Sequence, residues 1–258
     1  RVVVLADQNA WGSIFLGVED NAQLALNAMA WAAGEFELPE LPPPNLEFVS
    51  GEKYACGTVS KKGFHTFFVS AARVGEQIEN PQGTRHACRS KPGLGNSARV
   101  WLPGSLPSLH DLEEAERSVV ILDPSSKGVL VGTEELGWTL QDGVEVQGVP
   151  QWHHDLPISK HPVMTSEMVA LNLRPLRLDV GKSVLSIDQQ AVISLWRTPG
   201  GREVLVVLDA ALFANGLQGK ERSNPMRGDA QIQTAQQVAY RVLGWAYGMK
   251  NHESARQE

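Results

Sequence analysis

The chain carries the same pattern near both of its ends, and this internal repeat constrains the fold more than any other feature. Residues 2–17 align without gaps with residues 204–219, and residues 20–34 align with residues 234–248 after an insertion in the second copy. Each copy begins with consecutive aliphatic residues, typical of a strand covered on both faces, and continues with apolar residues at helical spacing. The repeat therefore predicts two strand–loop–helix units within an α/β fold.

Several residues of the repeat carry structural predictions of their own. Trp31 and Trp245 align and belong to the apolar faces of the two helices, so we expect both to be buried under a sheet. Asp229 is the predicted N-cap of the second helix, and Gly248 is its predicted left-handed C-cap.

The repeat also predicts a domain organisation. Residues 1–34 are expected to be the last strand and helix of an upstream copy, or else to add an edge strand to the sheet that contains the second copy. Residues 35–45 contain four prolines and are predicted to form an extended linker. Residues 46–258 are predicted to form the main α/β domain.

Periodicity and turn signals predict the elements between the two copies. Residues 46–50 are a predicted strand, residues 63–75 an amphipathic helix, and residues 76–97 a long irregular surface loop rich in Gly, Pro, Asn, Arg and Ser. A short helix at 108–116 and a buried strand at 118–123 follow. The remaining predictions are a helix closing at Gly137 or Gly143, a loop at 149–166, and strands at 168–174, 183–187, 191–197 and 203–209, the last two forming a hairpin or closely connected pair through the turn at 198–202.

Composition and charge exclude several classes of protein. The net charge is -6, which argues against a nucleic-acid-binding protein because such proteins need a basic face. No uninterrupted apolar stretch reaches the roughly 18 residues that span a bilayer, so no membrane span is expected. The chain starts at Arg1 with no initiator Met and no signal-peptide pattern, and we expect it to be a processed piece of a longer product.

The two cysteines, Cys56 and Cys88, leave two alternatives open. They are unrelated small residues, or they form a disulfide that closes the loop between them. A disulfide implies an oxidising compartment and favours an extracytoplasmic, periplasmic location over a cytoplasmic one. A two-cysteine metal site is not expected, because neither cysteine has a CxxC or CxxH neighbour.

The order of motifs resembles a known group of domains. The segment "KKGFHTFFVSAARVG", the strand "VVILDP", the segment "MVALNLRPLRL", the strand "GGREVLVVLD" and the terminal "GWAYG" occur in the order found in glutamine-amidotransferase-like sandwich domains of the DUF4350 and ThuA-like group. The resemblance covers roughly residues 46–248, with residues 1–34 as a partial copy. It implies a flavodoxin-like, mostly parallel sheet with helices on both faces.

The sequence departs from the true amidotransferases of this fold. Those enzymes carry a nucleophilic cysteine on a "GxCxG" strand-to-helix elbow and a downstream His-x-Glu. Here Cys56 lies in "YACGT", Cys88 lies in "HACRS", and no His-x-Glu occurs. Because a thiol without a neighbouring base is a poor nucleophile, amidotransferase chemistry is not expected.

Acidic residues at strand ends are the first candidates for a site, because ligands of open parallel sheets bind beyond the carboxyl ends of the strands. Asp123 and Asp209 each end a predicted strand, and with Asn215 they could line a polar pocket. The alternative is that each aspartate only caps a turn or the following helix.

Histidines and arginines supply the remaining candidates. His65 in the predicted helix at 63–75, and His153 and His154 in "WHHD", are candidates for proton transfer or catalysis, weighed against ordinary core or surface roles. Arg222 and Arg227 are candidates for binding an anion. No metal site and no cofactor are predicted.

Two functional hypotheses follow. The first is a non-catalytic binding or assembly module that engages a partner protein, a second copy of itself or a carbohydrate. The second is a ThuA-like hydrolase or sugar-modifying enzyme that uses acids and histidines at the strand ends. Convergence of Asp123, Asp209 and one of His65, His153 or His154 would favour the second hypothesis, and dispersal of these groups would favour the first.

Overall fold

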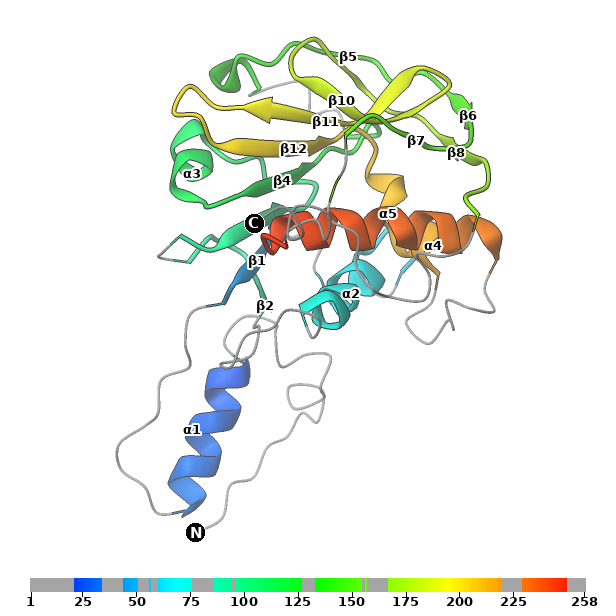
Figure 1. The fold of residues 1–258 in the computed structure, drawn as a ribbon. Coiled ribbons are helices and arrows are strands. Elements are labelled where there is room, and N and C mark those ends of the chain that lie inside the picture. Colours follow the sequence, from blue (N-terminus) through cyan, green and yellow to red (C-terminus); the bar gives the residue numbers. More distant parts are fainter. Residues whose placement is uncertain are drawn as a thin grey trace, which may run out of the picture.

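A large mixed sheet organises the computed structural model of this chain, which describes residues 21–33, 44–50, 56, 60–75, 86–93, 96–126, 133–154, 156, 167–219 and 229–249. The sheet has eight strands in the order β2-β1-β3-β4-β12-β11-β10-β7 (Figure 1). Along the sheet these strands are β2 (His86–Arg89), β1 (Leu46–Val49), β3 (Ala98–Trp101), β4 (Ser118–Ile121), β12 (Glu203–Val207), β11 (Gln190–Arg197), β10 (Lys182–Ile187) and β7 (Gln151–Trp152).

The sheet divides into a parallel and an antiparallel part. The five strands from β2 to β12 are parallel, and β11, β10 and β7 continue the sheet antiparallel to one another. The predicted strands at residues 46–50, 118–123 and 203–209 are confirmed in the parallel part. The predicted hairpin through residues 198–202 is confirmed as β11 and β12.

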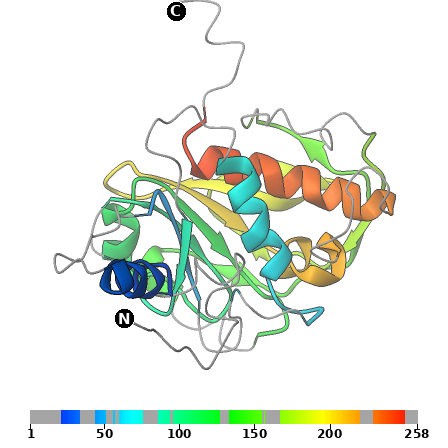
Figure 2. The same cartoon turned by 90° about the horizontal axis from the view of Figure 1, so that it is seen from below.

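Helices cover the two faces of the sheet unequally. Helices α2 (His65–Gly75) and α5 (Ala230–Ala246) pack side by side on one face, as Figure 2 shows. Their core includes Phe67, whose ring stacks on that of Phe213 at a centroid distance of 4.4 Å. The other face is covered by the short helix α3 (Leu109–Glu114), through Leu112, and by a segment that carries Trp138.

Alternation along β12 explains why the strand is aliphatic from Val204 to Val207. Leu205 and Val207 belong to the core under α2 and α5, whereas Val204 and Val206 belong to the core on the opposite face. All four side chains are fully buried. A strand covered on both faces needs a continuous apolar run, and this pattern is what predicted β12 from the sequence. The α/β prediction is therefore confirmed as a mixed sheet with helices.

The second copy of the repeat has the predicted local structure. Asp229 caps α5, with its carboxylate accepting a hydrogen bond from the backbone N–H of Gln231 at 2.8 Å. Gly248 has a φ of 74° beyond the end of α5, a conformation that glycine adopts without strain. Trp245 is 9% exposed and belongs to the core under the sheet, as predicted.

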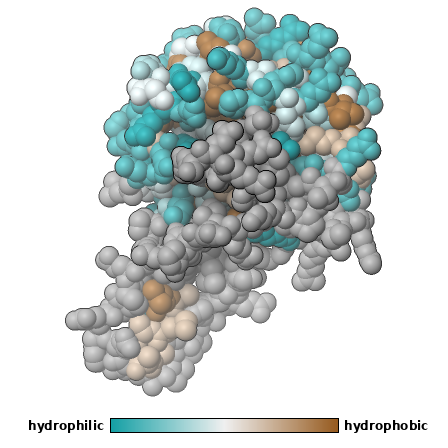
Figure 3. Space-filling model, in the orientation of Figure 1, coloured by the Kyte–Doolittle hydropathy of each residue, from teal (hydrophilic) through white to brown (hydrophobic). Residues whose placement is uncertain are grey.

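The first copy is described only in its helix, α1 (Asn21–Ala33), which confirms the predicted helix. The predicted strand at the start of the chain, and the side chain of Trp31, lie outside the described residues. Helix α1 stands apart from the sheet and from the helices that cover it (Figure 1). Leu24 is 50% exposed and Met29 is 65% exposed, although both align with fully buried residues of α5. Figure 3 shows the apolar patch on this helix.

The predicted loop at residues 76–97 is wrong in its second half. Strand β2 lies there, pairs in parallel with β1, and forms the edge of the sheet. The prediction failed because β2 has only four residues and is flanked by glycine, proline and arginine. Its place in the sheet depends on a partner about forty residues earlier, Phe48 pairing with Cys88, and not on any local pattern.

A disulfide joins Cys56 to Cys88 of β2, with a Cα–Cα distance of 6.3 Å. Both cysteines are buried. The backbone carbonyl of Cys56 also lies 3.1 Å from His65 Nδ1 at the start of α2. The bond therefore ties the edge strand to the segment that precedes α2.

A buried charged cluster lies between β1, β3 and the segment after β2. The side chains of Glu47 and Arg99 are 2% and 1% exposed, and Arg99 Nε lies 3.6 Å from Glu47 Oε2. Arg99 also donates to the backbone carbonyls of Gly93 and Asp111, each at 3.1 Å. Arg89 lies 3.9 Å from Glu47 Oε1.

Two of the other predicted elements are present in shortened form, and the predicted loop at 149–166 is wrong at its start, where β7 pairs with β10. The helix predicted to close at Gly137 is a single turn, η3 (Glu134–Leu136), and the predicted strand at 168–174 is β8 (Leu171–Leu173). Strand β8 pairs with β6 (Val146–Gly148), and β5 (Leu140–Gln141) pairs with β9 (Arg177–Leu178). A further turn, η5 (Ala210–Leu212), and helix α4 (Asn215–Gln218) follow β12.

Candidate functional site

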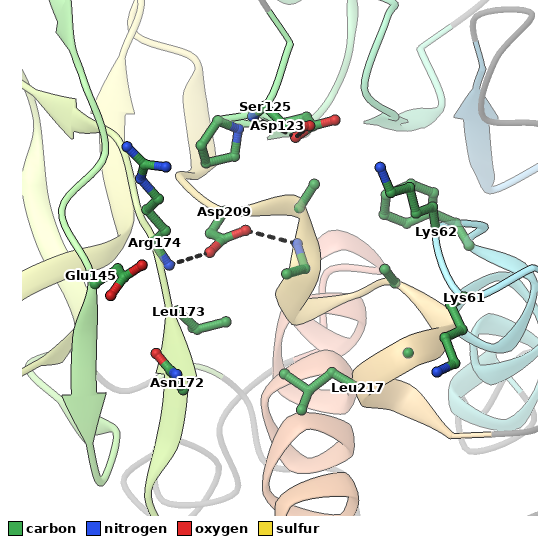
Figure 4. A pocket seen from close by; sticks show the side chains of 16 residues that line it. Lys61, Lys62, Asp123, Ser125, Glu145, Asn172, Leu173, Arg174, Asp209 and Leu217 are labelled. Atoms are coloured by element: carbon green, nitrogen blue, oxygen red, sulfur yellow. Dashed lines mark hydrogen bonds between the residues drawn. The ribbon is translucent and has the colours of Figure 1, made fainter.

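A pocket of about 570 Å³ opens at the carboxyl ends of the adjacent parallel strands β4 and β12. Both aspartates singled out in the sequence, Asp123 and Asp209, line it (Figure 4). This is the edge of a parallel sheet at which ligands bind. The other polar lining residues are Lys61, Lys62, Ser125, Glu145, Asn172 and Arg174.

Asp209 holds two parts of the pocket together. Its Oδ1 accepts a hydrogen bond from the backbone N–H of Ala211 at 2.9 Å, which caps η5. Its Oδ2 accepts from the backbone N–H of Arg174 at 2.6 Å, in the segment that follows β8. The residue is only 5% exposed, so one buried carboxylate joins the parallel sheet to the segment inserted between β4 and β12.

The environment of Asp209 raises the pKa of its carboxyl group above the ordinary value of 3.8. Burial is the main cause, because it disfavours the charged form. The hydrogen bonds from Arg174 and Ala211 act in the opposite direction, and the negative charge of Asp123 adds a further increase. The two aspartates are thus electrostatically coupled within one pocket.

Asp123 forms a turn as well as part of the pocket wall. Its Oδ1 accepts hydrogen bonds from the backbone N–H of Ser125 at 2.8 Å and from Ser125 Oγ at 2.7 Å. The side chain is half-buried. The capping role and the pocket role, which the sequence presented as alternatives, coincide at both aspartates.

Basic side chains enter the pocket from two directions. Lys61 and Lys62 come from the segment before α2, and Arg174 follows β8 (Figure 4). The backbone N–H of Gly216 in α4 donates to the carbonyl of Lys61 at 2.8 Å, which fixes the lysine segment beside α4. Small residues leave the space between these groups open: Ala210, Ala211, Ala214 and Gly216.

None of the candidate histidines is among the residues that line this pocket. His65 lies at the start of α2, is 3% exposed and contacts the carbonyl of Cys56. His154 is exposed beyond β7. The structure therefore brings Asp123 and Asp209 together but places the histidines elsewhere.

His153 forms a pair that resembles a nucleophile and base. Its Nε2 lies 2.6 Å from Oγ of Ser186 on β10. Ser186 is only 2% exposed, so a substrate could not reach its hydroxyl without displacing the surrounding strands. The contact is best explained as satisfying a buried hydroxyl.

Asn215 has a structural role next to the pocket. Its Oδ1 accepts from the backbone N–H of Thr66 at 2.8 Å, and its Nδ2 donates to the carbonyl of Ser60 at 2.8 Å. It thus joins α4 to the start of α2. Arg222 and Arg227, the predicted anion-binding residues, lie outside the described residues.

Besides Ser125, which lies in the same turn as Asp123, sequence analysis missed five polar residues of the pocket. Lys61 and Lys62 follow the first strand of the parallel sheet and precede a helix, so the rule for strand ends could have identified them. Glu145, Asn172 and Arg174 come from the inserted segment, where no local pattern marks them. Within the described part of the chain, no group of three or more His, Cys, Asp or Glu side chains could hold a metal ion.

The raised pKa of Asp209 predicts a pH dependence of stability. A group whose pKa is raised by folding contributes most below its unfolded value of 3.8 and loses that contribution as the pH rises through its folded pKa. We expect the difference in unfolding free energy between wild type and Asp209→Asn to fall as the pH rises from below 3.8 towards neutrality. Urea unfolding across this range measures it.

Asp179 provides a control of opposite sign for this measurement. Its carboxylate accepts a hydrogen bond from the backbone N–H of Thr139 at 2.9 Å, and this bond lowers its pKa. The difference between wild type and Asp179→Asn should therefore increase as the pH rises through the folded pKa of Asp179. If the difference in unfolding free energy changed with pH in the same direction for both variants, the opposite pKa shifts of Asp209 and Asp179 would be contradicted.

Comparisons with known proteins do not identify a family. No protein-family model matches the chain, and no curated protein matches it. Among solved structures, the chain is similar to the exo-beta-1,4-mannosidase Op5Man5 from Opitutaceae bacterium strain TAV5, with 9% sequence identity and a TM-score of 0.45. The match covers 83% of this chain and 38% of the mannosidase chain. Similarity at this level carries no inference about activity.

None of the helices in the described ranges has the length and apolar character needed to cross a bilayer.

Proposed function

We infer that this chain is an α/β binding module whose pocket at the ends of β4 and β12 takes a carbohydrate. The observation that carries the proposal is the composition of the pocket. Hydrogen-bond acceptors and donors surround a floor of small and apolar side chains in a space of about 570 Å³, which suits a sugar of one or two rings. Sugar hydroxyls both donate and accept, so they can use carboxylates and ammonium groups in the same site.

The placement of the histidines supports binding over catalysis as the primary role. Asp123 and Asp209 both line the pocket, but each already accepts two hydrogen bonds from the protein. His65 and His153 contact other parts of the structure. This dispersal favours the first of the two hypotheses drawn from the sequence.

The strand order supports the proposed family. The parallel strands run β2-β1-β3-β4-β12, which corresponds to the flavodoxin-like order 2-1-3-4-5 if the segment between β4 and β12 is taken as an insertion. We propose that the chain is a member of the amidotransferase-like DUF4350 and ThuA-like group. The disulfide between Cys56 and Cys88 supports a role in an oxidising compartment such as the periplasm.

Filling the pocket tests the proposal. Ala211 is exposed and lines the pocket, and its side chain can be enlarged without removing the backbone N–H that Asp209 binds. We expect saturation-transfer NMR with glucose, galactose, glucuronate and galacturonate to show binding of at least one sugar to wild type, and Ala211→Trp to abolish that signal. Ala230→Trp, at an exposed alanine of α5 outside the pocket lining, is the matched control and should retain it.

Two results would contradict a carbohydrate site. One is the absence of saturation transfer to every sugar of the panel. The other is an equal signal for wild type and Ala211→Trp.

A second candidate function, glycoside hydrolysis in the same pocket, is favoured by one observation. The raised pKa of Asp209 next to a second carboxylate is a feature of general acids. Release of nitrophenol from nitrophenyl glycosides by wild type, but not by Asp209→Asn, would support hydrolysis. No release by wild type would leave binding as the function.

A further inference from the structure

The charged groups of the pocket are distributed unevenly. Lys61 and Lys62 approach it from the α2 side, whereas Glu145 and Asn172 lie on the opposite side, in the inserted segment (Figure 4). Asp209 lies between them. A ligand in this space therefore meets two ammonium groups at one end, and a carboxylate, an amide and the guanidinium group of Arg174 at the other.

The ammonium groups of Lys61 and Lys62, like the guanidinium group of Arg174 and the carboxylate of Glu145, form no ion pair with another described residue. Asp209 and Asp123 each accept two hydrogen bonds, and Arg174 Nε donates to the carbonyl of Gly143 at 3.1 Å. Within the described ranges, neither lysine forms an ion pair. The two ammonium groups are thus available to an anionic part of a ligand.

The backbone next to the lysines favours a carboxylate over a phosphate. Phosphate sites commonly use several free N–H groups at a helix N-terminus or a glycine-rich loop. Helix α2 begins beside Lys61 and Lys62, but the N–H of Thr66 is already bound by Asn215 Oδ1 at 2.8 Å. The site therefore offers two ammonium groups and few free backbone donors, and a carboxylate with two oxygens and one negative charge needs fewer donors than a phosphate.

We propose that the preferred ligand of this pocket is a uronic acid or a glycan that contains one. The carboxylate of the sugar lies against Lys61 and Lys62. Its hydroxyls point towards Asp123 and Glu145, which accept hydrogen bonds from them, and towards Asn172. This assignment rests on the proposed carbohydrate site, and it specifies that the preferred sugar is negatively charged.

Matched pairs of sugars test the assignment. We expect glucuronate and galacturonate to bind about tenfold more tightly than glucose and galactose, because the ammonium groups attract the carboxylate and solvent exposure weakens that attraction. A tenfold difference corresponds to about 1.4 kcal/mol. Titration calorimetry, or NMR titration for weak binding, measures these affinities. The advantage of the uronates should decrease at high salt, which screens exposed charges.

The lysines are tested by Lys61→Met and Lys62→Met, singly and together. Both side chains are exposed, so the variants should fold, and circular dichroism checks this. In the double variant the ratio of uronate affinity to neutral-sugar affinity should fall towards one, with the affinity for uronates falling more than the affinity for neutral sugars. Lys182→Met, at an exposed lysine of β10 outside the pocket lining, should change neither.

The outcomes separate the two proposals. Equal affinity for uronates and neutral sugars, or a uronate preference unchanged in the double variant, would overturn the uronate assignment while leaving the carbohydrate site intact. Tighter binding of glucose 6-phosphate than of glucuronate would also overturn it. Binding of no sugar at all would overturn both proposals.

Discussion

Replacing Arg99 with methionine should lower the free energy of unfolding by about 3–5 kcal/mol, because it leaves the buried carboxylate of Glu47 with the partly exposed Arg89 as its remaining counter-charge. The two side chains are 1% and 2% exposed, so water cannot replace the lost guanidinium. The carbonyls of Gly93 and Asp111 would also lose a donor each. Urea or thermal unfolding of the folded variant measures the loss.

Arg197→Met is the matched control for this experiment. Arg197 forms an ion pair with Glu203 at 2.7 Å, shorter than the contact in the buried cluster, but its side chain is 70% exposed. Exposed pairs contribute about 0–1 kcal/mol, so this variant should be close to wild type. Equal losses in Arg99→Met and Arg197→Met would show that burial does not determine the effect.

The double variant Glu47→Leu/Arg99→Met distinguishes the effect of an unpaired buried charge from the effect of lost packing. Removing both charges leaves no unpaired buried charge, although the carbonyls of Gly93 and Asp111 still lose a donor and the N–H of Gly93 loses its acceptor. The double variant should therefore be more stable than Arg99→Met alone. Additive losses would contradict the electrostatic explanation and would indicate a loss of packing instead.

Reduction of the bond between Cys56 and Cys88 should destabilise the protein by about 4 kcal/mol, the value that loop-closure entropy gives for a separation of 32 residues. The loss of stability arises in the unfolded chain, whose conformational entropy increases when the cross-link is removed. Unfolding with and without reductant measures the difference. Intact mass should rise by two hydrogen atoms on reduction.

The Cys56→Ala/Cys88→Ala variant controls for other effects of the reductant. Its unfolding midpoint should match that of the reduced wild type and should not respond to reductant. An unchanged intact mass, or a wild-type midpoint that does not move on reduction, would contradict a structural disulfide.

The parts of the fold that were predicted from the sequence are those with strong local patterns. Strand β12 and helix α5 were predicted because a doubly covered strand is continuously apolar and a packed helix repeats its apolar residues. Asp229 and Gly248 marked the ends of α5 because capping requires particular residue types. These signals lie within a few residues of the structure that they determine.

The parts that were not predicted depend on contacts between distant residues. Strand β2 was missed because its four residues carry no pattern until they pair with β1. The pocket was also predicted only in part, because some of its residues reach it through contacts between distant parts of the chain. Asp123 and Asp209 lie at strand ends and could be found from the strands, whereas Glu145 and Arg174 reach the site only because the inserted segment folds back onto β12.

The two walls of the pocket differ in origin. One wall belongs to the parallel sheet and its helices, while the other belongs to a segment inserted between two neighbouring strands and anchored by the carboxylate of Asp209. Changes in the inserted segment can alter Glu145 and Asn172 without touching the doubly covered strands that stabilise the molecule. Because Asp209 binds the backbone N–H of Arg174 and not a side chain, substitutions at positions 145 and 172 can change the pocket wall while this anchor is kept.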